Sequence, residues 1–132
     1  MARSQRQQVG DRYETLALKF LCDAGLELVT RNYSCRVGEL DLVMRERDVI
    51  VFTEVRYRGT TRFSSAAATI TPMKQQRIVR TAEYFVLHHR EFQDSALRFD
   101  VVAIDQAGAS TDRNCSNSHI QWLRDAFRPG FY

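Results

Sequence analysis

The feature that most constrains the fold is residues 38–58, GELDLVMRERDVIVFTEVRYR, which predict two adjacent strands joined by a tight turn. We expect strands at about 39–45 and 49–57 and a two-residue loop at Arg47–Asp48, with Glu46 opposite Val49. Both faces of this pair are apolar, with one face formed by Leu40, Leu42, Met44, Val51 and Val55 and the other by Val43, Ile50 and Phe52. A strand pair that is apolar on both faces needs cover on both sides, which favours an α/β or α+β domain over an open meander.

The same register brings acidic residues together at one end of one face. Asp41 is predicted to lie directly opposite Glu54, and Glu39 opposite Arg56. Directly opposed like charges destabilise a strand pair, so two carboxylates on strands this apolar call for a cation, most simply a divalent metal ion. The alternative is an ordinary ion-pair ladder, Glu39 with Arg56, at a solvated strand end.

Five further elements surround the pair. Apolar residues recur every three or four positions from about 7 to 24 and predict an amphipathic helix, with Gly25 as its left-handed C-terminal cap. A strand is expected at about 26–36, where Asn32 is a candidate for a bulge or bend. Thr71-Pro72 predicts the start of a second helix that runs to about residue 89. Strands at 97–105 and, at an edge of the sheet, 119–127 complete the order α-β-β-β-α-β-β.

Two segments lack a clear period. Residues 59–70, rich in Ser, Thr and Ala, form a loop long enough to suggest a lid or a binding segment. Residues 106–118 are polar and turn-rich, and we expect them to be mobile. Asp100, inside the strand at 97–105, is expected to be a structural residue or an ion-pair partner.

Composition narrows the class of protein. A chain of 132 residues with 44% hydrophobic and 27% charged residues is typical of one soluble domain, here residues 1–132 with a core at about 7–127. No apolar run approaches the roughly 20 residues that span a bilayer, and the first ten residues are polar, so we expect a cytoplasmic protein without a membrane partner. Cys22, Cys35 and Cys115 lack the spacing of a zinc site or a disulfide framework.

A cationic tract adjoins the acidic residues. No Asp or Glu occurs between Val55 and Ala82, whereas six basic residues do: Arg56, Arg58, Arg62, Lys74, Arg77 and Arg80. Such a tract suits sequence-independent contacts to nucleic-acid phosphates, and the helix that begins after Thr71 adds backbone N–H groups suited to an anion. The alternative is a solvated basic face. An acidic cluster that binds a metal ion and a basic tract that binds phosphates would together suit a phosphodiester substrate.

Six motifs in order carry a resemblance to a known family. They are Gly10 and Glu14 of G-x-x-x-E, RNY at 31–33, GELDL at 38–42, FTEVRYR at 52–58, TPMKQQRI at 71–78 and RFDVVAI at 98–104. Together they resemble the YraN family of bacterial proteins, which is similar to the restriction-endonuclease-like superfamily and to archaeal Holliday junction resolvases. The resemblance implies a mixed β-sheet flanked by helices and a metal-dependent nuclease site of the D…(D/E)-x-K type.

The resemblance also implies roles for individual residues. Asp41 matches the metal-binding aspartate and Glu54 the second carboxylate, while Val55 would lend its backbone carbonyl to the metal. Glu14, which pattern alone would make a surface charge, resembles the helical glutamate that completes some resolvase sites. Glu39 belongs to the family signature and is an expected auxiliary residue.

Arg56 departs from the motif, which has lysine at this position. Arginine stays charged, so Arg56 is suited to hold a phosphate or to stabilise a negative transition state but not to act as a general base. Lys74 on the neighbouring helix is a candidate substitute.

These observations lead to three functional hypotheses. The first is a nuclease in which Asp41, Glu54 and Glu14 bind Mg²⁺ or Mn²⁺, metal-activated water hydrolyses DNA, and Arg56 stabilises charge. The second is an inactive module of the same fold that grips nucleic acid, including branched DNA, through Arg58, Arg62, Lys74, Arg77 and Arg80. The third is an interaction protein that needs neither metal nor nucleic acid. A two-fold branched DNA would favour a homodimer.

Overall fold

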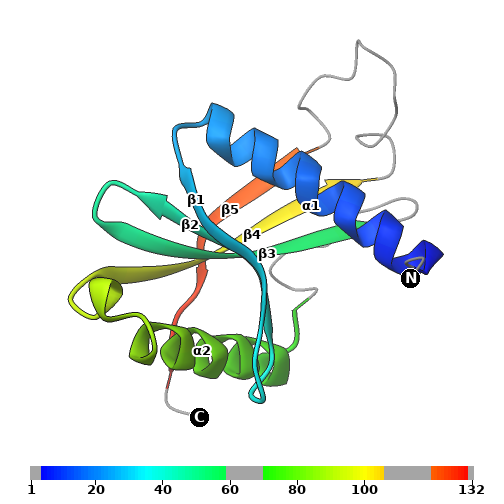
Figure 1. Cartoon of the computed structure of the whole chain (residues 1–132). Coiled ribbons are helices and arrows are strands. Elements are labelled where there is room, and N and C mark those ends of the chain that lie inside the picture. The colour runs from blue at the N-terminus through cyan, green and yellow to red at the C-terminus, as the bar shows by residue number, and fades with distance from the viewer. Residues whose placement is uncertain (1–3, 59–69, 106–119, 131–132) are drawn as a thin grey trace.

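The computed structural model describes residues 4–58, 70–105 and 120–130, and these residues form a mixed five-stranded sheet (Figure 1). The sheet has the order β1-β2-β3-β4-β5, and its strands are β1 Glu27–Ser34, β2 Glu39–Glu46, β3 Val49–Arg58, β4 Ala96–Asp105 and β5 Ile120–Phe127. Strands β3 and β4 are parallel, and the other neighbours are antiparallel. The mixed α/β class and the edge position of the last strand are confirmed.

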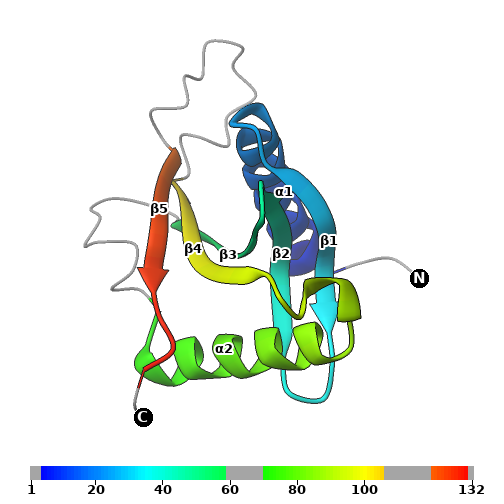
Figure 2. The same ribbon diagram turned by 90° about the vertical axis from the view of Figure 1, so that its left-hand side faces the viewer.

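One long helix covers each face of the sheet. Helix α1 (Gln5–Asp23) and helix α2 (Pro72–Leu87) lie on opposite sides in both views (Figures 1 and 2). A short 3₁₀ helix, η2 (Arg90–Phe92), follows α2 and was not expected; otherwise the predicted order of elements agrees with the structure. The predictions for 59–69 and 106–119 fall outside the described residues.

The two faces carry two separate apolar clusters. On the α1 side the cluster contains Tyr13, Ala17, Leu21, Leu42, Met44, Val51, Val102 and Ile104. On the α2 side it contains Val43, Ile50, Phe52, Ile78, Ala82, Phe85, Phe99 and Val101. The central strands are therefore buried on both faces, as their apolar residues predicted. No helix in residues 4–58, 70–105 and 120–130 is long and apolar enough to cross a membrane.

Local signals explain where the helices begin and end. Ser4 and Gln7 form a capping box at the start of α1, and Gly25, with φ of 101°, follows its last turn in the left-handed conformation that glycine tolerates. Thr71 caps α2 and Pro72 is its first residue, as predicted. Helix α2 ends at Leu87, slightly earlier than expected.

The β2–β3 hairpin has the predicted loop and the predicted register. Pairing begins at Glu46 with Val49 and, within the described residues, continues to Leu42 with Thr53. The expected rungs from Asp41 and Glu39 lie beyond this ladder. Strand β2 instead stays paired with β1 down to Glu39 opposite Ser34.

Leu40 packs on the side opposite to the one we predicted. Alternation placed it with Leu42 and Met44, but it belongs to the cluster under α2 together with Phe52. Two-stranded ribbons twist more strongly than wide sheets. Once β2 has separated from β3, the β1–β2 ribbon carries Leu40 around to the α2 side, and its turn lies beside that helix in both views (Figures 1 and 2).

Gly38, at the start of this ribbon, permits a close approach to α2. A Cβ atom added at this position would lie 2.8 Å from Oγ1 of Thr81 and 3.3 Å from Cγ of Arg77. Thr81 is fully buried, and its hydroxyl donates a hydrogen bond to the Arg77 carbonyl, so it has little freedom to move away. Glycine is thus required here for space.

We therefore expect Gly38→Ala to lower the free energy of unfolding by about 1–3 kcal/mol, the usual effect of overpacking. The matched control is Gly10→Ala in α1, where an added Cβ meets nothing within 4 Å. That change should be neutral or should stabilise the helix by up to about 1 kcal/mol. Urea unfolding of both variants checks the pair, and equal effects would contradict the proposed close contact.

A buried ion pair fixes β5 against β4. Asp100 is fully buried and accepts hydrogen bonds from Nε and Nη2 of Arg98, at 2.8 and 2.9 Å. It also accepts from the Trp122 indole and from the Asp125 backbone N–H, each at 2.9 Å. The prediction that Asp100 is an ion-pair partner is confirmed.

Candidate metal and nucleic-acid site

The candidate site lies where β2 separates from β3. One ladder step beyond the last pair, Oδ2 of Asp41 accepts a hydrogen bond of 2.9 Å from the Val55 backbone N–H. In a continuing antiparallel ladder that N–H would donate to a carbonyl of β2. The Asp41 side chain thus replaces a rung of the sheet, and this bond fixes its carboxylate at the opening between the strands.

Glu54 lies on β3 next to this opening. Its side chain is only 8% exposed, and its Oε1 lies 3.0 Å from Nζ of Lys74. Lys74 is in the first turn of α2, where its backbone N–H donates to the Thr71 hydroxyl at 3.2 Å. The structure therefore brings Lys74, which the sequence could not place, directly to the second carboxylate of the cluster.

Glu14 reaches the same region from α1. It is 8% exposed, which the helical pattern alone did not predict. Nε of Arg31 lies 3.5 Å from its Oε1, but the geometry is not that of a hydrogen bond, and this buried oxygen has no hydrogen-bond partner among the described residues. A buried carboxylate oxygen without a donor is costly unless a further group completes its environment.

Burial and mutual repulsion raise the pKa values of these three carboxyl groups. The pKa of Glu54 is raised to about 8, first by burial and then by the charge of Asp41, against the opposing effect of Lys74. Burial also raises the pKa of Asp41, although the Val55 N–H partly offsets this. The pKa of Glu14 is raised by burial and by Asp41. A bound cation would relieve this repulsion.

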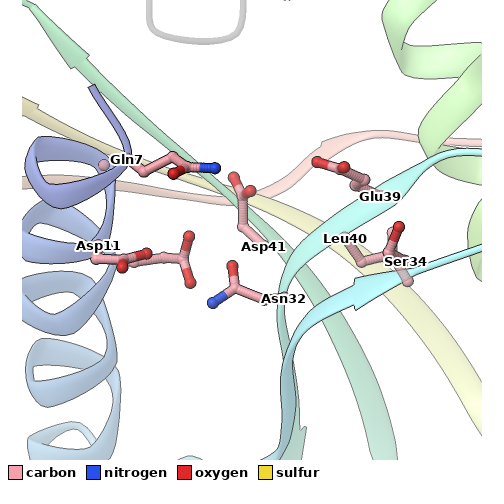
Figure 3. Close-up of a pocket in the computed structure, with 9 residues that line it drawn as sticks. Gln7, Asp11, Asn32, Ser34, Glu39, Leu40 and Asp41 are labelled. Carbon is pink, nitrogen blue, oxygen red and sulfur yellow. The ribbon is translucent and has the colours of Figure 1, made fainter. Parts of the chain in front are cut away.

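Two pockets adjoin Asp41 on opposite sides. The pocket toward α1 has a volume of about 440 Å³, and its polar lining includes Gln7, Asp11, Glu14, Asn32, Glu39 and Asp41 (Figure 3). The pocket toward α2 has a volume of about 430 Å³, and its charged lining is Glu39, Asp41, Glu54, Lys74 and Arg77. The pocket toward α1, with its carboxylates, suits a bound cation. The pocket toward α2, where Lys74 and Arg77 line the wall together with carboxylates, suits a phosphate next to a bound cation.

The donor set fits a hard divalent cation better than zinc. Within residues 4–58, 70–105 and 120–130, no group of three or more His, Cys, Asp or Glu side chains is gathered closely enough to hold a metal ion. Mg²⁺ commonly uses one or two carboxylates together with waters and substrate phosphate, whereas a structural zinc site needs four protein ligands. Oε1 of Glu14, which is buried and lacks a hydrogen bond although Arg31 lies 3.5 Å away, is a further oxygen near Asp41.

The remaining predicted residues are distributed around this site. Arg56 is half-buried on β3, with Ala103 as its partner on β4, so the predicted pairing with Glu39 is not part of the ladder. Glu39 lines both pockets. Of the basic residues, Arg77 lines the pocket toward α2, Arg80 is exposed on the same helix, Arg58 ends β3, and Arg62 lies outside the described residues.

Sequence reasoning missed three residues that line the pocket toward α1. Gln7 and Asp11 lie two turns and one turn before Glu14, respectively, a spacing that places all three on one face of α1. Asn32 was noted only as a bend in its strand; it has φ of 55°, a left-handed conformation, and lines the same pocket. Both signals, helical spacing and a strand asparagine, were visible in the sequence.

Comparison with known proteins identifies the family. Residues 13–104 match the uncharacterised protein family UPF0102. The chain belongs to the UPF0102 family. It is 44% identical over 124 residues to a UPF0102 protein of Stutzerimonas stutzeri, covering 94% of this chain and 98% of that protein. A UPF0102 protein of Nitrosococcus oceani is 41% identical over 128 residues, covering 97% and 98% of the two chains.

The UPF0102 match includes the central charged residues of the site. Glu14, Asp41, Glu54 and Lys74 all lie within residues 13–104, whereas β5 lies beyond them. The match covers α1 from Tyr13 onward, the first four strands almost completely, α2 and the whole pocket toward α2, whereas Gln7, Gly10 and Asp11 of the pocket toward α1 precede it.

Proposed function

We propose that this UPF0102 protein is a cytoplasmic, metal-dependent nuclease of the restriction-endonuclease-like type that acts on DNA. The observation that supports this most is a pair of carboxylates, Asp41 on β2 and Glu54 on β3, that line one pocket together with Lys74 and Arg77, while Glu14 of α1 lies near Asp41 in the adjoining pocket. The order of elements and the YraN-like motifs are consistent with such a fold. Mg²⁺ or Mn²⁺ would be the cofactor.

Each residue has a defined part in this proposal. Asp41, Glu54 and the Val55 carbonyl would hold the cation, with Glu14 near Asp41 in the adjoining pocket as a further carboxylate of the site. When bound, the cation would activate water and offset negative charge that develops on the phosphate. Lys74 and Arg77 would bind the phosphate in the pocket toward α2. Arg56 would stabilise charge in the transition state but cannot accept a proton.

A DNA-binding module that does not cut is the second candidate. Arg56 favours it, since the residue at the motif's lysine position is permanently charged. Binding would then rest on Arg58, Arg62, Lys74, Arg77 and Arg80, and branched DNA would be the preferred partner, with a homodimer matching its two-fold symmetry.

Cleavage of branched, flapped and linear DNA in the presence of Mn²⁺ tests these proposals. We expect the wild-type protein to cut at least one of these substrates and Asp41→Asn to be slower by about 100-fold or more, since the ion's contribution amounts to several kcal/mol. Asparagine retains an oxygen that can accept the Val55 N–H, so the variant should fold.

Three other results would each change the proposed function. Cleavage by Arg56→Lys alone would support the binding module for the natural protein. Equal cleavage by wild type and Asp41→Asn would contradict the proposed site. If the protein neither cuts nor binds any of these DNAs, the interaction protein that needs no nucleic acid becomes the better account.

A further inference from the structure

Lys74 and Glu54 form an ion pair whose two members differ in exposure. Glu54 is 8% exposed on a central strand, whereas the Lys74 side chain is 42% exposed at the mouth of the α2 pocket. The Lys74 backbone is fixed by its bond to the Thr71 cap, but its ammonium sits on a flexible four-carbon stem. The ammonium can therefore move while the carboxylate stays in place.

A divalent cation and the Lys74 ammonium would compete for the same oxygen. Oε1 of Glu54, the proposed metal ligand, is the atom that Lys74 contacts at 3.0 Å. Because the Lys74 side chain is 42% exposed and flexible, its ammonium can move aside when a divalent ion takes its place at Glu54. The displaced ammonium would remain in a pocket lined by Arg77, where a phosphate would be its natural partner.

We propose that Lys74 is a placeholder cation, which neutralises Glu54 in the metal-free protein and moves to the substrate phosphate when the metal binds. This inference rests on the proposed function. It makes metal binding and nucleic-acid binding reciprocally coupled, because each ligand favours the arrangement in which Lys74 has left Glu54. Lys74 is then a positioning residue that links the two ligands, beyond a contact to phosphate alone.

Titration calorimetry with Mn²⁺ at a pH above 8, where Glu54 is ionised, tests the first half of the inference. Removing a competing cation should tighten binding, so Lys74→Gln should lower the Mn²⁺ dissociation constant by about fivefold. Lys74→Arg, which retains a cation, should remain close to wild type. Arg77→Gln is the matched control, because it removes a charge from the same pocket and helix but not the ion pair with Glu54. It should change the constant by less than about twofold.

The second half of the inference, the coupling of metal binding to nucleic-acid binding, is tested by measuring the affinity for a labelled DNA duplex with and without Ca²⁺, a cation that prefers oxygen ligands. Wild type should bind DNA more tightly when Ca²⁺ is present, and Lys74→Gln should lose most of that increase. Unchanged or weaker Mn²⁺ binding in Lys74→Gln, or equal tightening in Arg77→Gln, would overturn the placeholder role alone. If neither wild type nor Lys74→Gln binds Mn²⁺, the proposed metal site fails as well.

Discussion

In the absence of metal, raising the pH from about 4.5 to about 8 is expected to destabilise this protein. The pKa of Glu54 rises from an ordinary value of 4.5 to about 8 on folding, and the pKa values of Asp41 and Glu14 rise with it. The folded state therefore binds more protons than the unfolded state in this range, and stability falls as pH rises. The contribution is fully present below about 4.5 and is lost by about 8.

The size of this loss is up to about 4 kcal/mol, since each unit of pKa shift corresponds to about 1.4 kcal/mol. Glu46 has the opposite sign, because Arg98 lowers its pKa, but its contribution is lost only at pH values below the range considered. Urea unfolding in EDTA, repeated across this range, measures the effect. A stability that rises between these pH values would contradict the crowded carboxylate cluster.

A substitution isolates the cause. Glu54→Gln removes the group with the largest resolved shift and should flatten the profile, leaving the variant more stable than wild type at pH 8 by about 2–4 kcal/mol. Glu83→Gln makes the same chemical change at an exposed position of α2 and should reproduce the wild-type profile. Identical profiles for both variants would assign the pH dependence to other groups.

Asp100→Ala is expected to destabilise the fold by about 3–5 kcal/mol, the usual effect of removing one partner from a buried ion pair. Asp100 is fully buried and accepts four hydrogen bonds, from two nitrogens of Arg98, the Trp122 indole and the Asp125 N–H. Alanine would leave these donors unpaired on the strands β4 and β5. Glu46 retains its 2.7 Å contact with Arg98, so that charge would keep one partner.

The control for this variant is Asp125→Asn. The Asp125 side chain pairs with exposed Arg128, and asparagine tolerates the left-handed conformation, φ of 54°, at this position. The change should leave the stability nearly unchanged. Chemical unfolding of the two variants compares them directly, and an equally small effect of Asp100→Ala would show that the network contributes little.

Much of the fold followed from local signals in the sequence. The two-residue loop at Arg47–Asp48 fixed the register of β2 and β3, and Thr71-Pro72 set the start of α2. Apolar residues on both strand faces predicted the two helical layers. These features depend on neighbours in the chain, which is why a sequence reports them well.

The site was only partly predictable because it depends on where the sheet opens. Alternation extended the β2–β3 ladder to Asp41 and beyond, whereas β2 separates there, Asp41 bonds to Val55 and Leu40 turns toward α2. The prediction that Asp41 and Glu54 lie close together is correct, but they line one pocket where the sheet opens and are not a pair of the β2–β3 ladder. The burial of Glu14 and the contact of Lys74 with Glu54 depend on how helices dock, which periodicity does not specify.

The central claim is that the carboxylates at Asp41 bind a divalent cation. Thermal unfolding at pH 8 with increasing Mn²⁺ tests it most directly, because a ligand that binds only the folded state raises the unfolding temperature with its concentration. We predict a progressive rise for the wild-type protein that reverses the pH-dependent loss of stability. Asp41→Asn, which can retain the bond to Val55, should show little or none of this rise. Equal rises in both proteins, or no rise in the wild type, would contradict the claim.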